Sequence, residues 1–331
     1  IVSVAGQEDC EEFVSPTATV AIHVSETTKA LWNSLGSPHN EWKMWHIYGF
    51  LMEQFRADGT PFAVVSDADI DAGLLMNGGE PRYAIIFSLA NDCISNETAL
   101  KIKEFVFAGG HTFAGSTSWT RNENGVLRNS PIGKFFALST EMGLMAGVPI
   151  LIGDCKRTGV DSPLVSHLEN DPVVRGWKLA RNAGANGFYH PTHWALQVQA
   201  TTATVLAATG NGNPILTTHR YGNGCFIYHS EFNPLAGYSM HTVANFTYGF
   251  YRKAIEEAHA ELACPLVRLG AWPWPYVAGF MTRHDHFSNL GFDGIAGNGD
   301  DSEVARIEAL HGVHGSHLLR TNVALPNSGQ S

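Results

Sequence analysis

The sequence predicts an α/β fold in which a parallel sheet is followed by an antiparallel meander. Apolar, strand-sized runs alternate with helical patterns as far as Gly115. Strands and helices that alternate with short connections imply a parallel sheet with right-handed crossovers. Beyond Gly115, short apolar runs are separated by turns rich in glycine and asparagine, which are typical of hairpins. No repeat and no low-complexity linker interrupts this order.

The first expected strand is 19–24 (TVAIHV), which is apolar and rich in β-branched residues. Over 40–56, tryptophan, tyrosine, methionine and phenylalanine recur at steps of three and four. That period predicts a helix with one buried face. Ala57-Asp-Gly ends the helix, and 61–65 is the second expected strand.

The alternation then repeats. The run 83–89 (YAIIFSL) is continuously apolar, as expected of a strand that is covered on both faces. Ser95 is the expected N-cap of the next helix, which should end at Gly109-Gly110, because glycine commonly follows the last helical turn. The run 111–115 (HTFAG) is the next expected strand.

The later part of the chain has a different pattern. Short strands are expected at 203–208, 214–218 and 225–229, separated by Gly-Asn-Gly turns. Such turns favour antiparallel pairing. A helix is expected from about 240 to 262, apolar and aromatic in its first half and charged in its second.

The composition argues against two classes of partner. The 331 residues include 31 Asp and Glu against 21 Lys and Arg, for a formal charge of −10. An acidic chain without a basic patch repels phosphate backbones and anionic lipids, so we expect no nucleic-acid partner and no binding to bare membrane. No apolar run approaches the roughly 20 residues that cross a bilayer, so no membrane span is expected.

Several features are compatible with a secreted, extracellular protein, which we predict. The chain begins at Ile1 rather than Met, as removal of a signal peptide would explain. Glycosylation sequons begin at Asn96 and Asn245. The cysteines form no CxxC pair, which argues against a zinc ribbon or a thioredoxin-type motif. Two disulfides with one thiol, or five free thiols, are the alternatives for Cys10, Cys93, Cys155, Cys225 and Cys264.

Residues 48–119 contain a helix, a strand that follows Gly-x-Pro-Phe and ends in Ser-Asp, a further strand, and a second helix. After Ala-Gly-Gly comes a last strand that ends in Gly-Ser-Thr-Ser. This order resembles the glutamine-amidotransferase-like domain known as the β-galactosidase trimerisation domain, and 214–228 resembles its closing hairpin. The resemblance implies that 1–262 form a flavodoxin-like or amidotransferase-like parallel sheet with antiparallel hairpins added, and serve as a carbohydrate-binding module. Amidotransferases carry a nucleophilic cysteine on a strand-to-helix turn, but 114–118 contain no cysteine and no GxSxG pattern, so the domain is expected to be non-catalytic.

Residues 269–289 (LGAWPWPYVAGFMTRHDHFSN) place an apolar strand before Thr282-Arg-His-Asp-His286. This segment looks like the opening strand of the polysaccharide deacetylase (NodB-homology) barrel, and 307–321 resembles the helix and strand that follow. The resemblance implies that 263–331 are the start of a (β/α) deacetylase-type barrel, which stops inside that domain. The Trp272-Pro-Trp-Pro-Tyr entry is similar to that of secreted fungal deacetylases that act on galactosamine-containing exopolysaccharide.

The same resemblance implies a divalent metal, zinc, that polarises an acetyl carbonyl and activates a water molecule. Asp285 is the candidate catalytic base or metal ligand, and the flanking His284 and His286 are candidate metal ligands. The family's later His-Ser/Thr-x-x-His motif does not occur before Ser331, so we expect no complete active site in this chain.

Trp272, Trp274 and Arg283 are the candidate substrate-binding residues, since tryptophans stack on sugar rings. The alternative for the two tryptophans is an extended strap over the domain edge, because proline fixes φ and aromatic residues fill cores. Alternative metal ligands are the histidines at 190 and 193, or at 311, 314 and 317, although neither group is spaced to converge.

Two functions follow from these resemblances. The first is metal-dependent removal of N-acetyl groups from an extracellular polysaccharide that contains amino sugars. The second is a non-catalytic glycan-binding or assembly module on the amidotransferase-like scaffold. Release of acetate from a partly acetylated glycosaminan distinguishes them.

Overall fold

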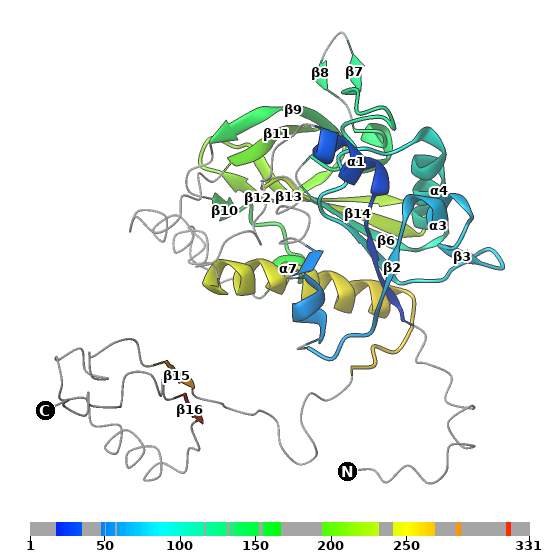
Figure 1. Cartoon of the computed structure of the whole chain (residues 1–331). Coiled ribbons are helices and arrows are strands. Elements are labelled where there is room, and N and C mark those ends of the chain that lie inside the picture. The colour runs from blue at the N-terminus through cyan, green and yellow to red at the C-terminus, as the bar shows by residue number, and fades with distance from the viewer. Residues whose placement is uncertain are drawn as a thin grey trace, which may run out of the picture. The chain divides into compact units, whose positions relative to one another are not determined.

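The computed structural model divides the chain into two units, 1–269 and 270–331, and each is described by itself (Figure 1). In the first unit the structure describes residues 18–34, 48–49, 51–56, 58–115, 117–130, 133–134, 136–151, 155–166, 194–231 and 241–268. In the second unit it describes 283–285 and 316–318.

The main feature of the first unit is a sheet of eight strands in the order β10-β12-β13-β14-β6-β5-β1-β2. Five neighbouring strands are parallel: β1 (Val20–His23), β2 (Phe62–Val65), β5 (Ile85–Ser88), β6 (His111–Gly115) and β14 (Gly224–His229). Three further strands continue the sheet in antiparallel fashion: β13 (Pro214–Tyr221), β12 (Thr204–Thr209) and β10 (Cys155–Arg157).

Both faces of this sheet are covered, which explains the continuous apolar runs (Figure 1). Helix α7 (His241–Glu261) packs on one face, together with the short 3-10 helix η2 (Pro163–Val165). Helices α3 (Asp67–Asp71) and α4 (Asn96–Ala108) pack on the other. Because successive strand residues point to opposite faces, Val20 and Ile22 join the first core and Ala21 joins the second.

A second, four-stranded sheet was not predicted. Its order is β11-β9-β8-β7, formed by β11 (Trp194–Ala200), β9 (Leu144–Leu151), β8 (Gly133–Lys134) and β7 (Asn129–Ser130). Leu144, Leu196 and Val198 of this sheet pack into the core under α4. The remaining elements are α1 (Glu26–Ser34), α5 (Ser139–Met142) and a small hairpin of β3 (Met76–Asn77) and β4 (Glu80–Pro81).

The predicted ends of α4 are confirmed. The Ser95 hydroxyl accepts a hydrogen bond from the Thr98 amide at 2.9 Å, which satisfies one of the free N–H groups of the first turn. Gly109 follows the last turn with φ of 127°, a conformation that only glycine adopts at low cost. At the start of α3, Ser66 and Asp69 form a capping box.

The predicted fold class, a flavodoxin-like or amidotransferase-like parallel sheet with hairpins added, is wrong. The expected parallel sheet and the expected antiparallel strands belong to one eight-stranded sheet, because β14 pairs with β6 on one side and with β13 on the other. An apolar run such as 225–229 reads the same in a hairpin and in a buried parallel strand, so the sequence does not reveal its neighbours. Of the deacetylase-type barrel start, the structure describes only β15 (Arg283–Asp285) paired in parallel with β16 (Ser316–Leu318).

Candidate functional site

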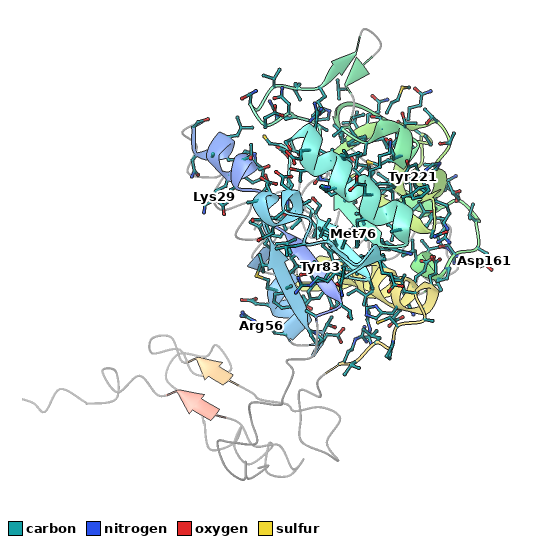
Figure 2. All side chains as sticks on the ribbon, turned by 90° about the vertical axis from the view of Figure 1, so that its right-hand side faces the viewer. Lys29, Arg56, Met76, Tyr83, Asp161 and Tyr221 are labelled. Carbon is teal, nitrogen blue, oxygen red and sulfur yellow. The ribbon has the colours of Figure 1, made fainter. Side chains whose placement is uncertain are left out.

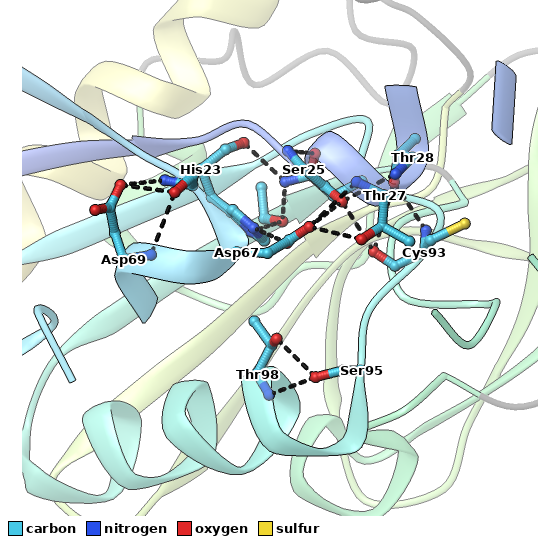
Figure 3. A network of polar contacts seen from close by, with 12 residues as sticks. His23, Ser25, Thr27, Thr28, Asp67, Asp69, Cys93, Ser95 and Thr98 are labelled. Atoms are coloured by element: carbon cyan, nitrogen blue, oxygen red, sulfur yellow. Dashed lines mark hydrogen bonds and ion pairs between the residues drawn. The ribbon is translucent and has the colours of Figure 1, made fainter. Parts of the chain in front are cut away.

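The carboxyl ends of β1, β2, β5, β6 and β14 lie along one edge of the sheet, which we call the carboxyl edge. Ligands of open α/β sheets bind outside the carboxyl ends of the strands. Polar residues occur at this edge in each of the five strands or directly after it. They include His23, Asp67, Asn91, Thr117 and Glu231. The carboxyl edge is therefore the candidate site (Figure 3).

Asp67 accepts several hydrogen bonds from residues of the β1–α1 turn. Its carboxylate accepts from His23 Nε2 at 2.8 Å, from Ser25 Oγ at 2.8 Å and from Thr27 Oγ1 at 3.1 Å. Burial alone would raise the pKa of Asp67, but the hydrogen bonds from His23, Ser25 and Thr27 lower it below its ordinary value. Asp67 is therefore a stable carboxylate and is unsuited to serve as a general acid.

Ser88 fixes the proton positions of the network. Its hydroxyl accepts from Asn91 Nδ2 at 2.9 Å and from Trp119 Nε1 at 3.0 Å, and it lies 3.2 Å from His23 Nδ1. A hydroxyl has two acceptor lone pairs and one proton, so Ser88 donates to His23 Nδ1. This hydrogen bond assigns the remaining ring proton to Nε2, which faces Asp67.

Asn91 joins three segments and is fully buried. Its Nδ2 group donates to the carbonyl of His23 at 2.7 Å and to Ser88. Its Oδ1 atom accepts from the amide of Ser25 and from the hydroxyl of Tyr48, each at 3.0 Å. One side chain therefore holds the end of β1, the end of β5 and the helical segment around Tyr48 in register.

Asp92 forms the outer rim of the edge. Its carboxylate accepts hydrogen bonds from Thr117 Oγ1 and, at 3.3 Å, from Trp32 Nε1. Asp92 and Thr117 are half-buried, as is Asp67, whose side chain is 17% exposed. The rim thus presents two partly exposed carboxylates whose directions are set by their neighbours.

Cys93 lies beside these carboxylates and is not a nucleophile. Burial raises its pKa to about 11, and the charge of Asp92 and, more weakly, that of Asp67 act in the same direction. Cys93 is therefore a neutral thiol near pH 7, and both carboxylates lie within electrostatic reach of it. Cys93, Cys225 and Cys264 are free, so the alternative of two disulfides is wrong.

A second buried pair lies at the end of β14. His229 Nε2 is 2.9 Å from Glu231 Oε2, and the two side chains are 2% and 7% exposed. Residues two apart on a strand share a face, and the His229 ring lies against Phe250 of α7 at 5.7 Å. Burial, and after it the charge of Glu231, raises the pKa of Tyr251. This pair belongs to the α7 side of the sheet.

The structure does not describe the side chains of the predicted site residues. Arg283, His284 and Asp285 form β15, whose side chains lie outside the described part of the structure, as do His286, Trp272 and Trp274. Their catalytic, metal-binding and sugar-binding roles stay predictions. The carboxyl-edge residues were missed, although each polar residue that directly follows an expected strand was a usable signal.

Zinc binding also stays a prediction. Within the described residues, no three histidine, cysteine or acidic side chains come close enough together to hold a metal ion. The same part of the chain contains no helix with the length and hydropathy of a membrane span.

No protein-family model matches the sequence, and no curated protein matches it significantly. Solved structures are similar at low identity. The β-galactosidase from Bacillus circulans sp. alkalophilus is 17% identical over 73% of this chain and 31% of that chain, with a TM-score of 0.49. The β-galactosidase from Rahnella sp. R3 is 18% identical over 75% and 32%, with a TM-score of 0.47. The exo-β-1,4-mannosidase Op5Man5 from Opitutaceae bacterium strain TAV5 is 11% identical over 79% and 38%, with a TM-score of 0.41.

The chain therefore spans about a third of the length of these β-galactosidases. The solved structures named above are glycosidases and not polysaccharide deacetylases, so the assignment to a deacetylase with an amidotransferase-like domain is wrong. The predicted function, metal-dependent removal of N-acetyl groups from an extracellular polysaccharide by a secreted deacetylase, is corrected with it. So is the alternative of a module on an amidotransferase-like scaffold, since it depends on the same fold assignment.

Proposed function

We propose that the carboxyl edge binds a carbohydrate that contains amino sugars. The observation that supports this proposal is the pair of half-buried carboxylates, Asp67 and Asp92. Ser25 Oγ connects their segments, because it lies 2.8 Å from Asp67 Oδ2 and 3.4 Å from the carbonyl oxygen of Cys93, which directly follows Asp92. Each is oriented by neighbouring donors before any ligand arrives. A preorganised polar site loses less entropy when it binds.

The chemistry of these groups suits amino sugars. An ionised carboxylate accepts hydrogen bonds from sugar hydroxyls and forms stronger, charge-assisted ones with an ammonium group. Thr117 and Trp32 orient the Asp92 carboxylate by donating hydrogen bonds to it. The formal charge of −10 adds a field that attracts cationic ligands and repels uronic acids.

Calorimetric titration with three oligosaccharides of equal length tests the proposal: a galactosaminan, its N-acetylated form and a neutral galactan. We expect the galactosaminan to bind tightest to the full chain. Asp92→Asn should weaken that binding roughly tenfold to a hundredfold, because a hydrogen bond to a charged group contributes about 1.5–3 kcal/mol. The matched control is Asp161→Asn, which changes an exposed aspartate in a loop (Figure 2).

The asparagine at position 92 retains an acceptor oxygen, so the fold should be preserved and the loss should reflect charge. Equal binding of the three oligosaccharides would contradict the amino-sugar preference. Absence of binding to all of them, or equal effects of the two substitutions, would refute the site.

A further inference from the structure

Asparagine followed by glycine is the step of a polypeptide at which spontaneous deamidation meets the least resistance. The reaction needs the backbone nitrogen of the glycine to reach the Cγ atom of the asparagine side chain, and glycine has no Cβ atom to obstruct that approach. The described residues contain four such steps, which begin at Asn77, Asn124, Asn211 and Asn223. All four asparagines are exposed, so exposure alone does not distinguish them.

At three of these steps the fold opposes the reaction. The amide of Gly125 donates to the carbonyl of Asn122 at 2.9 Å. The amide of Gly212 donates to the carbonyl of Thr209, also at 2.9 Å. Gly224 is buried in β14, inside the eight-stranded sheet. The nitrogen that would attack is therefore hydrogen-bonded at two of these steps and buried at the third.

The step at Asn77 is different. Asn77 ends β3 and Gly78 begins the turn to β4, in a hairpin that projects from the first unit (Figure 1). Within the described part of the chain, neither the side chain of Asn77 nor the amide of Gly78 makes a hydrogen bond. A Cβ atom at Gly78 would have no other atom within 4 Å. Both reacting groups are thus unpaired and accessible to solvent.

This hairpin can open without disturbing the rest of the fold. It is a separate two-stranded sheet with two residues in each strand, joined by Gly78 and Gly79 with φ of 60° and 93°. A two-stranded ribbon on its own is at best marginally stable in water, and glycines increase the entropy gained on opening. Opening lets the Asn77 side chain rotate toward the Gly78 nitrogen. The turns at Asn211 and Asn223 belong to the eight-stranded sheet, whose opening costs far more free energy.

We propose that Asn77 is a site of spontaneous deamidation, which converts the end of β3 from a neutral amide into a carboxylate. The Gly78 nitrogen attacks Asn77 Cγ, and the new C–N bond closes a succinimide ring. The Nδ2 group leaves as ammonia with the proton of the attacking nitrogen. Water then opens the ring at either carbonyl, which gives aspartate or isoaspartate at position 77.

Both products weaken the hairpin. In isoaspartate the backbone runs through Cβ, so one extra carbon enters the chain between β3 and the turn. Because Met76 pairs with Pro81 and Asn77 pairs with Glu80 across a two-residue turn, this insertion breaks the ladder. Aspartate keeps the ladder but places a second carboxylate directly opposite Glu80, and like charges in that position are destabilising.

Peptide mass spectrometry of the full chain, incubated at pH 8 and sampled over days, measures the exchange of the side-chain NH2 for OH at each of the four steps. In the native chain we expect Asn77 to deamidate at least about tenfold faster than the other three asparagines. The control is the same chain in urea, where no fold protects any step and the four rates should become similar. A rate at Asn77 no higher than the others in the native chain, or an equal lead in urea, would overturn the proposal.

A pair of variants checks the assignment by charge. Isoelectric focusing of the native protein should show an acidic form that grows with time. Asn77→Gln should remove most of it, because the longer side chain would have to close a larger ring. Asn124→Gln is the matched control at an exposed loop position and should leave the acidic form unchanged. Growth of the same acidic form in N77Q, or its loss in N124Q, would refute the site.

Discussion

Asn91 offers the most direct test of the carboxyl-edge network. Asn91→Ala removes four hydrogen bonds at a fully buried position. Ser88 still accepts from Trp119, and the Tyr48 oxygen still accepts from the amide of Ala90. The amide of Ser25, the O–H proton of Tyr48 and the carbonyl of His23 each lose the partner that Asn91 provides. Each buried group left without a partner costs about 1–3 kcal/mol, and a water molecule that enters the space would offset part of this. We expect the free energy of unfolding to fall by about 4 kcal/mol.

The assay is urea unfolding followed by tryptophan fluorescence, since Trp119 is fully buried beside this network. Asn124→Ala is the control, because Asn124 is exposed and its replacement should change the free energy of unfolding by less than about 0.5 kcal/mol. A loss below about 1 kcal/mol for Asn91→Ala would show that the network is not cooperative and would refute the reasoning.

Two further predictions concern titratable groups. Burial, followed by the charge of Glu261, raises the pKa of Glu257. The contribution of Glu257 to stability is therefore present at low pH and is lost as the pH rises through the folded-state pKa. Glu257→Gln should raise the melting temperature more at pH 8 than at pH 4, and an equal rise at both would contradict this. Cys264 is half-exposed, whereas Cys93 is buried and its pKa is raised to about 11. Iodoacetamide at pH 8 should therefore label Cys264 faster than Cys93 in the native chain, as peptide mass spectrometry would show. Faster labelling of Cys93 would count against its burial.

The parts of the fold that local pattern determines could be predicted from the sequence. The run at 83–89 contains β5, and Ser95 with Gly109 sets the ends of α4, because strand period, capping and left-handed glycine act over a few residues. The second sheet was missed because β9 pairs with β11, which follows it much later in the chain. Leu144 and Ala146 show the alternation of a half-buried strand, but the glycine and proline that follow obscure it.

The sequence indicates where the strands of the candidate site end, but not which of its residues contact one another. His23 ends an apolar strand and looks like a strand residue, while Asp67 begins a helix 44 positions later. Parallel pairing of β1 with β2 places them together, and no spacing in the sequence encodes that contact. The resemblance of 269–289 to a deacetylase strand directed the predicted site to Asp285 instead of to the residues at the ends of these strands.

The position of β14 has a consequence for synthesis of the chain on the ribosome. β6 pairs with β5, which has already emerged, but its other side pairs with β14, where Cys225 lies opposite His111. Until residues near 229 leave the exit tunnel, the nascent sheet carries an open, apolar flank in its middle. An unpaired strand edge of this kind can pair with other chains. The growing polypeptide therefore most needs chaperone binding in the time between the emergence of β6 and that of β14.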